Sequence, residues 1–339
     1  MTVDENLAHL SNNLVYSAMA AYAAALAAFT IDLSGRGRVA EKPAEQQAAP
    51  KQKAAALTAP GGRPVAGVPD QAAGVVPEQV TPERRKAAAI GVTVTWLAFL
   101  LHLGGVIARG AASHRAPWGN MYEFSVSGAV VVTGVFLVTL FKKDLRFLGT
   151  FVVGPVLLIL GLAVTVLYTE AAQLVPALQS YWLIIHVSIA FIASALLTLG
   201  FSVTIIQLVQ DRREQQRAAG KTLKGGNFMN KLPPSAELEH TAYRLHAIAF
   251  PLWTFTLMAG AIWAEKAWGR YWNWDPKEVW TFVIWVVYAG YLHARATRGW
   301  DGRRAAYFAL VGYACVLVNF LVVNIFFSGL HSYAGVGSN

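Results

Sequence analysis

Eight apolar stretches of about 20 residues each constrain most strongly what this chain can fold into. They cover residues 12–32, 87–109, 122–141, 147–168, 180–208, 243–264, 278–296 and 304–328. A helix needs about 20 mostly apolar residues to cross the hydrocarbon core of a bilayer. Only 14% of the 339 residues are charged, whereas soluble domains have about a quarter. The sequence therefore predicts an all-α, polytopic membrane helical bundle with about eight transmembrane helices.

The distribution of Lys and Arg predicts how these helices are oriented. Twenty-two of the 28 basic residues lie in segments 33–86, 142–146, 210–239 and 294–304, and the alternate segments hold five when Arg109 at the edge of one is included. Cytoplasmic loops carry the excess of basic residues in membrane proteins. Both termini are therefore expected outside, together with segments 110–121, 169–179, 265–277 and 329–339. The net charge of +9 is explained by this orientation signal, so nucleic acid is not an expected partner.

The chain divides into three parts. Residues 1–32 are expected to form the first transmembrane helix and not a cleaved signal peptide, because they lack the basic region and the cleavage site of such a peptide. Residues 33–86 are rich in Ala, Pro, Gln and Gly and predict a disordered cytosolic linker. Residues 87–339 form a seven-helix membrane core. The single cysteine, Cys315, excludes a disulfide framework and a CxxC redox pair.

An external segment, residues 265–280 (EKAWGRYWNWDPKEVW), is unusually rich in tryptophan. One interpretation is an aromatic belt at the membrane surface, although a belt needs only one or two rings at each helix end. Asp275 and Pro276 also suit a helix start, where Asp275 is the N-cap. The other interpretation is a wall of indoles for a large planar ligand with anionic edges, such as a porphyrin with two propionates. The residues of that wall are Trp268, Trp272, Trp274 and Asp275, with Arg270 and Lys277 as propionate partners on charge and position.

Three histidines are candidates for the axial ligands that a porphyrin iron requires. His186 lies about two turns into the fifth stretch from its external end, and His331 follows the last stretch on the same side. His293 lies near the cytosolic end of the seventh stretch, and an ionisable group at membrane depth is a functional candidate. Each also has an ordinary explanation: a buried structural histidine, a solvated tail residue and an interfacial residue, respectively. His102 and His114 are weaker candidates.

Several motifs resemble those of one known family. The segment WGRYWNWDPKEVW is similar to the tryptophan-rich "WWD" signature of haem-handling membrane proteins, and four further motifs occur in order with it. These are HRAPWGNMYEFS, LVPALQSYWLIIHV, YLHARATRGWDGRRAA and GLHSYA. Together they resemble the CcsA family, also called ResC and labelled CcsB in some actinobacteria, of the system II cytochrome c synthetase. The family's external loop usually begins Gly-His-x-Pro-x-x-Asn, and the departure at Ser113 weakens a role for His114.

The resemblance implies a function, a cofactor and partners. It implies export of haem b to the outer face of a bacterial cell membrane. There the haem is presented for thioether attachment to the CxxCH motif of apocytochrome c, without catalytic residues beyond those that position the haem. By resemblance His186 and His331 are the external haem ligands, and His293 is an intramembrane ligand whose counterpart belongs to the partner. The implied partners are a CcsB/ResB-type membrane subunit, apocytochrome c and thiol-reducing proteins.

Two alternative functions stay open from the sequence. The haem-delivery subunit of an ABC-type maturation system shares the tryptophan signature, although it typically has six spans. A b-type electron-transfer membrane cytochrome would also bind haem, but it usually pairs histidines on facing helices within the membrane. A small-molecule permease is disfavoured because the sequence shows no internal repeat.

Overall fold

The computed structural model describes residues 3–35, 84–172, 179–221, 228–229 and 232–331. Within these ranges the chain forms helices and short connections, and no strand occurs there. The helices are α1 (Glu5–Gly35), α2 (Arg84–Ser113), α3 (Met121–Leu140), η1 (Arg146–Leu148), α4 (Gly149–Thr165), α5 (Tyr181–Ala218), α6 (Ser235–Trp268), α7 (Pro276–Arg298), α8 (Gly302–Leu317), the π-helical turn η4 (Val318–Val322) and α9 (Val323–Phe326). The all-α prediction is confirmed.

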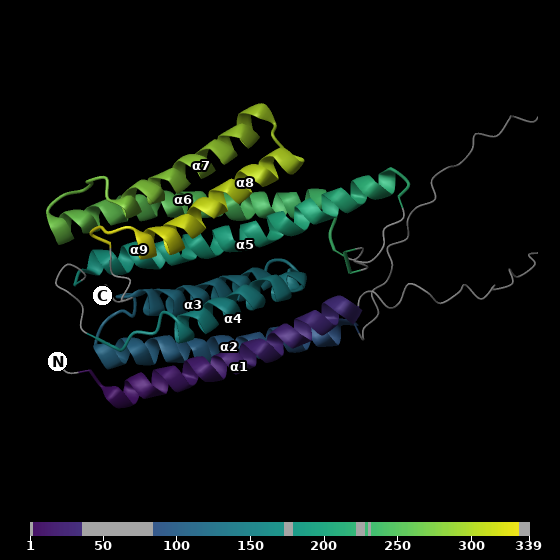
Figure 1. Ribbon diagram of the computed structural model, residues 1–339. Coiled ribbons are helices and arrows are strands. Elements are labelled where there is room, and N and C mark those ends of the chain that lie inside the picture. The colour runs from purple at the N-terminus through teal and green to yellow at the C-terminus, as the bar shows by residue number, and fades with distance from the viewer. Residues whose placement is uncertain (1–2, 36–83, 173–178, 222–227, 230–231, 332–339) are drawn as a thin grey trace, which may run out of the picture.

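The helices form two groups that lie side by side (Figure 1). The first group holds α1 to α4, and the second holds α5 to α9. The most extensive packing joins α1 to α2 and α5 to α6, and α3 contacts α5 across the boundary between the groups. This boundary is where the candidate site lies.

Seven of the described helices are long and apolar enough to cross a membrane. They correspond to seven of the eight predicted stretches, and α8, η4 and α9 together form one of them, from Gly302 to Phe326. The difference concerns residues 278–296. They do form the helix α7, whose 23 residues match a span in length, but its Trp, Tyr and His side chains lower its mean hydropathy. The chain is thus a multi-pass membrane protein in which α7 is the least apolar long helix.

Helix boundaries follow ordinary capping chemistry. Asn120 caps α3 by accepting a hydrogen bond from the backbone N–H of Glu123. Asp275 and Glu278 form a capping box at the start of α7, with Pro276 at its first position. The long helices α6 and α7 each end at a glycine with a left-handed backbone, which suits a residue without a Cβ atom.

The loops predicted to be external lie at one end of the bundle. The backbone N–H of Asp4 donates to Ala112, and Arg115 Nε donates to the carbonyl oxygen of Ala172 at 2.9 Å. The loop after α9 is joined to the α6–α7 loop through Leu330 and Asp275. The alternate loops meet at the opposite end, where ion pairs join Arg295 to Glu239 and Arg303 to Asp211. Successive loops therefore alternate between the two ends of the bundle, as the distribution of basic residues predicts.

The predicted linker is only partly described. Helix α1 continues to Gly35 and helix α2 begins at Arg84, so both ends of segment 33–86 are helical. Residues 36–83 lie outside the described residues, as do 173–178, 222–227, 230–231 and 332–339. The prediction of a disordered linker therefore stays a prediction.

Candidate functional site

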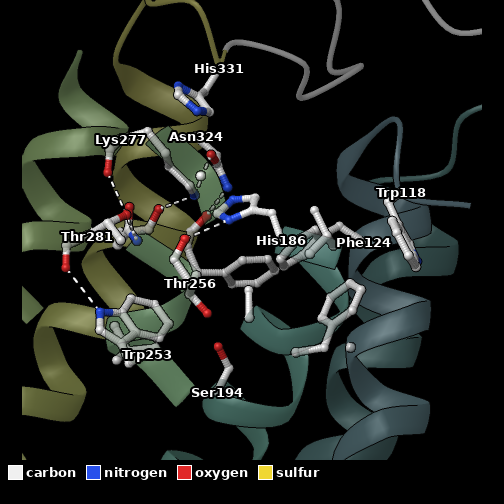
Figure 2. Close-up of a pocket in the computed structure, with 18 of the residues that line it drawn as sticks. Trp118, Phe124, His186, Ser194, Trp253, Thr256, Lys277, Thr281, Asn324 and His331 are labelled. Carbon is white, nitrogen blue, oxygen red and sulfur yellow. Dashed lines mark hydrogen bonds between the residues drawn. The ribbon is translucent and has the colours of Figure 1, made fainter. Parts of the chain in front are cut away.

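A cavity of about 460 Å³ lies between the two helix groups. This volume falls within the roughly 300–1,000 Å³ typical of sites for small molecules and cofactors. Its wall is formed by residues of α3 to α9 and η4, by the loops before α3 and α7, and by His331 after α9. It extends from Leu183 to Thr198 along α5, which is roughly 22 Å at 1.5 Å per residue. Most of its lining is aliphatic or aromatic, and its basic groups gather near His331 (Figure 2).

His186 is held rigidly on α5 at this cavity. Its Nδ1 donates to the carbonyl oxygen of Thr256 on α6 at 2.9 Å. Its ring stacks on Trp263, with 6.0 Å between ring centroids and 9° between planes. A Cβ atom at Gly260 would lie 2.8 Å from the Cε1 of His186, so the imidazole needs a glycine there. Because Nδ1 carries the proton, the lone pair of Nε2 is free to bind a metal.

His331 reaches the same cavity from the loop that follows α9. Its Nδ1 lies 2.8 Å from Oδ1 of Asp275, and its ring contacts the indoles of Trp263 and Trp268 edge to face. Burial raises the pKa of Asp275, but the hydrogen bonds from His331, Leu330 and Lys277 outweigh it and hold the pKa below its usual value. Asp275 is therefore a carboxylate at neutral pH, and Nε2 of His331 is again the nitrogen left for a metal.

Lys277 brings a basic amine to the cavity wall. Its Nζ donates to the backbone carbonyl of Asn319 and to Oδ1 of Asn324, each at 2.9 Å. Asn319 lies in the π-helical turn, whose wider winding leaves carbonyl groups available, a feature frequent at functional sites. Lys277 and Asn324 lie between the two histidines in the view of Figure 2. Burial lowers the pKa of the Lys277 amine to about 7, and Asp275 opposes the shift, so an anionic group bound beside this amine would favour its charged form.

The predicted indole wall is divided among three positions. Trp272 lines the cavity, whereas Trp268 packs against His331 from outside the lining. Trp274 is 73% exposed and has a left-handed backbone with φ of 61°, which is rare for a bulky residue. Arg270 also lies outside the lining, where it pairs with Glu278 at 3.4 Å and covers the ring of Trp268. Of the two predicted propionate partners, only Lys277 faces the cavity.

The remaining histidine candidates lie elsewhere. His293 is exposed on α7 near the opposite end of the bundle and does not line the cavity. His102 is fully buried beside Tyr22, and His246 is fully buried beside Tyr288 and Tyr291. The structure therefore brings together His186 and His331 and separates both from His293.

Sequence reasoning missed the part of α6 that carries the site. Thr256, Gly260 and Trp263 recur at helical spacing on one face, and each contacts His186. Their i, i+4, i+7 spacing places them on one face of the helix, and a helical-wheel projection of α6 shows this from the sequence. Trp118 and Phe124 of the motif HRAPWGNMYEFS also line the cavity from the other helix group, and tertiary packing shows that they face it.

Comparisons with known proteins identify the family. Residues 118–331 match the model of the cytochrome C assembly protein family, and these limits include both Trp118 and His331. The cytochrome c biogenesis protein CcsA of Guillardia theta is 36% identical over 231 residues, covering 64% of this chain and 76% of that protein. CcsA of Synechococcus elongatus is 33% identical over 290 residues, covering 74% and 89%.

A solved structure shows the same fold. The cytochrome c heme lyase CcmF superposes with a TM-score of 0.58 at 15% identity. The match covers 94% of this chain and 47% of CcmF, so the chain spans about half the length of that protein. At this identity the likeness concerns the fold alone. The sequence matches carry the assignment: this chain belongs to the cytochrome c assembly protein family, among the CcsA proteins of cytochrome c biogenesis.

Proposed function

We propose that this protein brings haem b to the outer face of a bacterial cell membrane and presents it for covalent attachment to apocytochrome c. It acts with a CcsB/ResB-type membrane subunit, as in a system II synthetase. One observation carries the proposal. Two histidines from distant parts of the chain line one cavity between the helix groups, and each has its Nδ1 engaged by a partner.

The donor set suits an iron porphyrin. An iron porphyrin bound in this cavity would be held by histidine side chains, which are common protein ligands of haem iron. His186 and His331 supply two imidazole Nε2 atoms, and aromatic rings of the cavity wall suit the apolar faces of the macrocycle. Lys277 is the propionate partner that the geometry favours over Arg270, because only Lys277 faces the cavity. Trp272 also lines the cavity and would contact a bound porphyrin.

The reaction served by this site adds a cysteine thiol to a haem vinyl group. The S–H bond and the vinyl π bond break, an S–C bond and a C–H bond form, and no electrons are exchanged overall. The protein's contribution is proximity and orientation, since the vinyl group must lie beside the thiol of the CxxCH motif. Thiol-reducing proteins supply the cysteines in their reduced form.

His293 has a different role in this proposal. It is exposed on α7, a helix whose composition is less apolar than that of the other long helices. An exposed imidazole at membrane depth is costly against lipid and suits a protein interface. We assign it as the intramembrane haem ligand whose counterpart comes from the partner subunit.

Co-purification from membranes tests the proposal. The full chain should retain a haem with the spectrum of two histidine ligands and should bring down a second membrane polypeptide. A strain that lacks the protein should fail to assemble c-type cytochromes. A b-type electron carrier would show a redox-cycling haem spectrum while cytochrome c assembly continued in the deletion strain, and that result would contradict the proposal.

A further inference from the structure

We infer that Asp275 is a positioning residue that holds His331 in place as a haem ligand. This inference rests on the proposed function and deepens it. From the sequence, Asp275 is explained by a helix cap or a place in the indole wall. In the structure its carboxylate is shared between the start of α7 and the loop that carries His331.

Both oxygens of Asp275 are used. Oδ1 accepts from Nδ1 of His331 at 2.8 Å and from the backbone N–H of Lys277 at 3.1 Å. Oδ2 accepts from the backbone N–H of Leu330 at 2.7 Å. A Cβ atom at Gly329 would lie 2.4 Å from Oδ2, so the glycine permits this close approach. One buried carboxylate therefore fastens the loop of His331 to the helix start.

The two histidines depend on different supports. His186 is part of α5, and its Nδ1 donates to the neutral carbonyl of Thr256. His331 lies in a loop after α9, and its ring is held by Asp275 and by the edges of two indoles. A carboxylate acceptor makes a stronger, charge-assisted hydrogen bond and raises the basicity of the imidazole. Asp275 therefore affects both the position and the donor strength of His331 and leaves His186 unaffected.

Two substitutions separate this role from helix capping. Serine is a good N-cap but is too short to reach His331, so Asp275→Ser keeps the cap and loses the contact. Asp275→Asn keeps an acceptor of the same shape without its charge. Loss of an outer-shell partner typically costs about 10- to 100-fold in metal affinity. We expect D275S to reduce haem retained by the full chain with its partner about 10-fold and D275N to reduce it less.

Asp301 provides the matched control. It occupies the N-cap position of α8 at the opposite end of the bundle and makes no side-chain capping bond. Asp301→Ser should retain haem like the wild type. A loss equal to that of D275S would show a general effect of removing an acidic residue and would overturn the inference.

A double-variant experiment tests whether Asp275 acts through His331. In a His331→Gly protein without added imidazole, D275S should cause no further loss of the haem that remains, because the residue that Asp275 positions is absent. A full additional loss in that background would overturn the inference. So would wild-type haem retention in D275S itself.

A measurement without haem distinguishes this inference from the proposed function. Hydrogen–deuterium exchange at the backbone N–H of Leu330 should become faster in D275S than in the wild type, since its acceptor is lost. Unchanged exchange would overturn the inference even where haem binding by the two histidines holds. Wild-type protein with no histidine-ligated haem would overturn the proposed function, and the inference with it, whatever the exchange rates.

Discussion

The two ends of the bundle use charged side chains differently. At the end opposite the site, Glu239 accepts from Arg295 of α7 and from the first backbone N–H of α8, so charges join helix to helix. At the site end, Glu123 binds Arg115 and the backbone N–H of Gly119, and Asp275 binds His331. There the charges hold loops, and the loops carry residues of the cavity. Removing a charged side chain at the end opposite the site should therefore reduce stability alone. Removing one at the site end should reduce both stability and haem binding.

The largest expected effect is on the two cavity histidines. His186→Gly or His331→Gly should lower retained haem at least about 10-fold, because each removes an axial ligand of the iron. Added imidazole should restore part of it in either variant. Absorption spectra of the purified proteins measure both effects. His240→Gly is the control, since His240 is exposed near the opposite end, and it should leave haem content unchanged.

The next largest effect is expected when the carboxylates of Glu123 and Glu239, one from each end of the bundle, are removed. Glu123→Ala leaves two arginines without their partner at side-chain exposures of 3% and 10%, which should cost about 3–5 kcal/mol. It also releases the loop of Trp118, so haem per folded molecule should fall. Glu239→Ala should cost about 1.5–3 kcal/mol and leave haem per folded molecule unchanged. Thermal unfolding in detergent with haem quantification measures both, and an equal loss of haem in the two variants would contradict the contrast between the ends.

A smaller effect is expected at the glycine that supports His186. In Gly260→Ala the new Cβ would overlap the imidazole, and overpacking of this kind costs about 1–3 kcal/mol. Haem affinity should fall about 10-fold, as 1.4 kcal/mol corresponds to a factor of ten. Gly161→Ala is matched to it, because nothing lies within 4 Å of that Cβ position. Haem titration of both variants is the measurement, and equal affinities would show that His186 is not confined by α6.

The smallest effect separates two neighbouring tryptophans. Trp272→Ala should weaken haem retention by about 2- to 12-fold, the equivalent of roughly 0.5–1.5 kcal/mol for one aromatic contact. Trp274→Gly should leave retention unchanged and slightly raise the unfolding temperature, because glycine tolerates the left-handed backbone at that position. A larger loss of retained haem in Trp274→Gly than in Trp272→Ala would contradict the placement of Trp272 at the haem site.

The sequence predicts the helices better than the site. Apolar length and basic loops are local features, so the helical class and the common end of the predicted external loops follow from them. Residues 278–296 are the marginal case, because aromatic and histidine side chains within a helix reduce hydropathy without preventing the helix. The placement of Trp274 outside the cavity depends on a single left-handed residue, which residue types alone do not reveal. The hydrogen bond between His331 and Asp275 joins residues 56 positions apart, and only tertiary structure can show it.

The central claim is that His186 and His331 together bind one haem iron. A cryo-electron microscopy structure of the full chain with its partner, purified with bound haem, tests it most directly. The account predicts one iron within bonding distance of Nε2 of both residues, with Trp272 beside the porphyrin. Density for the haem at another site, or an iron bound by a different pair of residues, would contradict it.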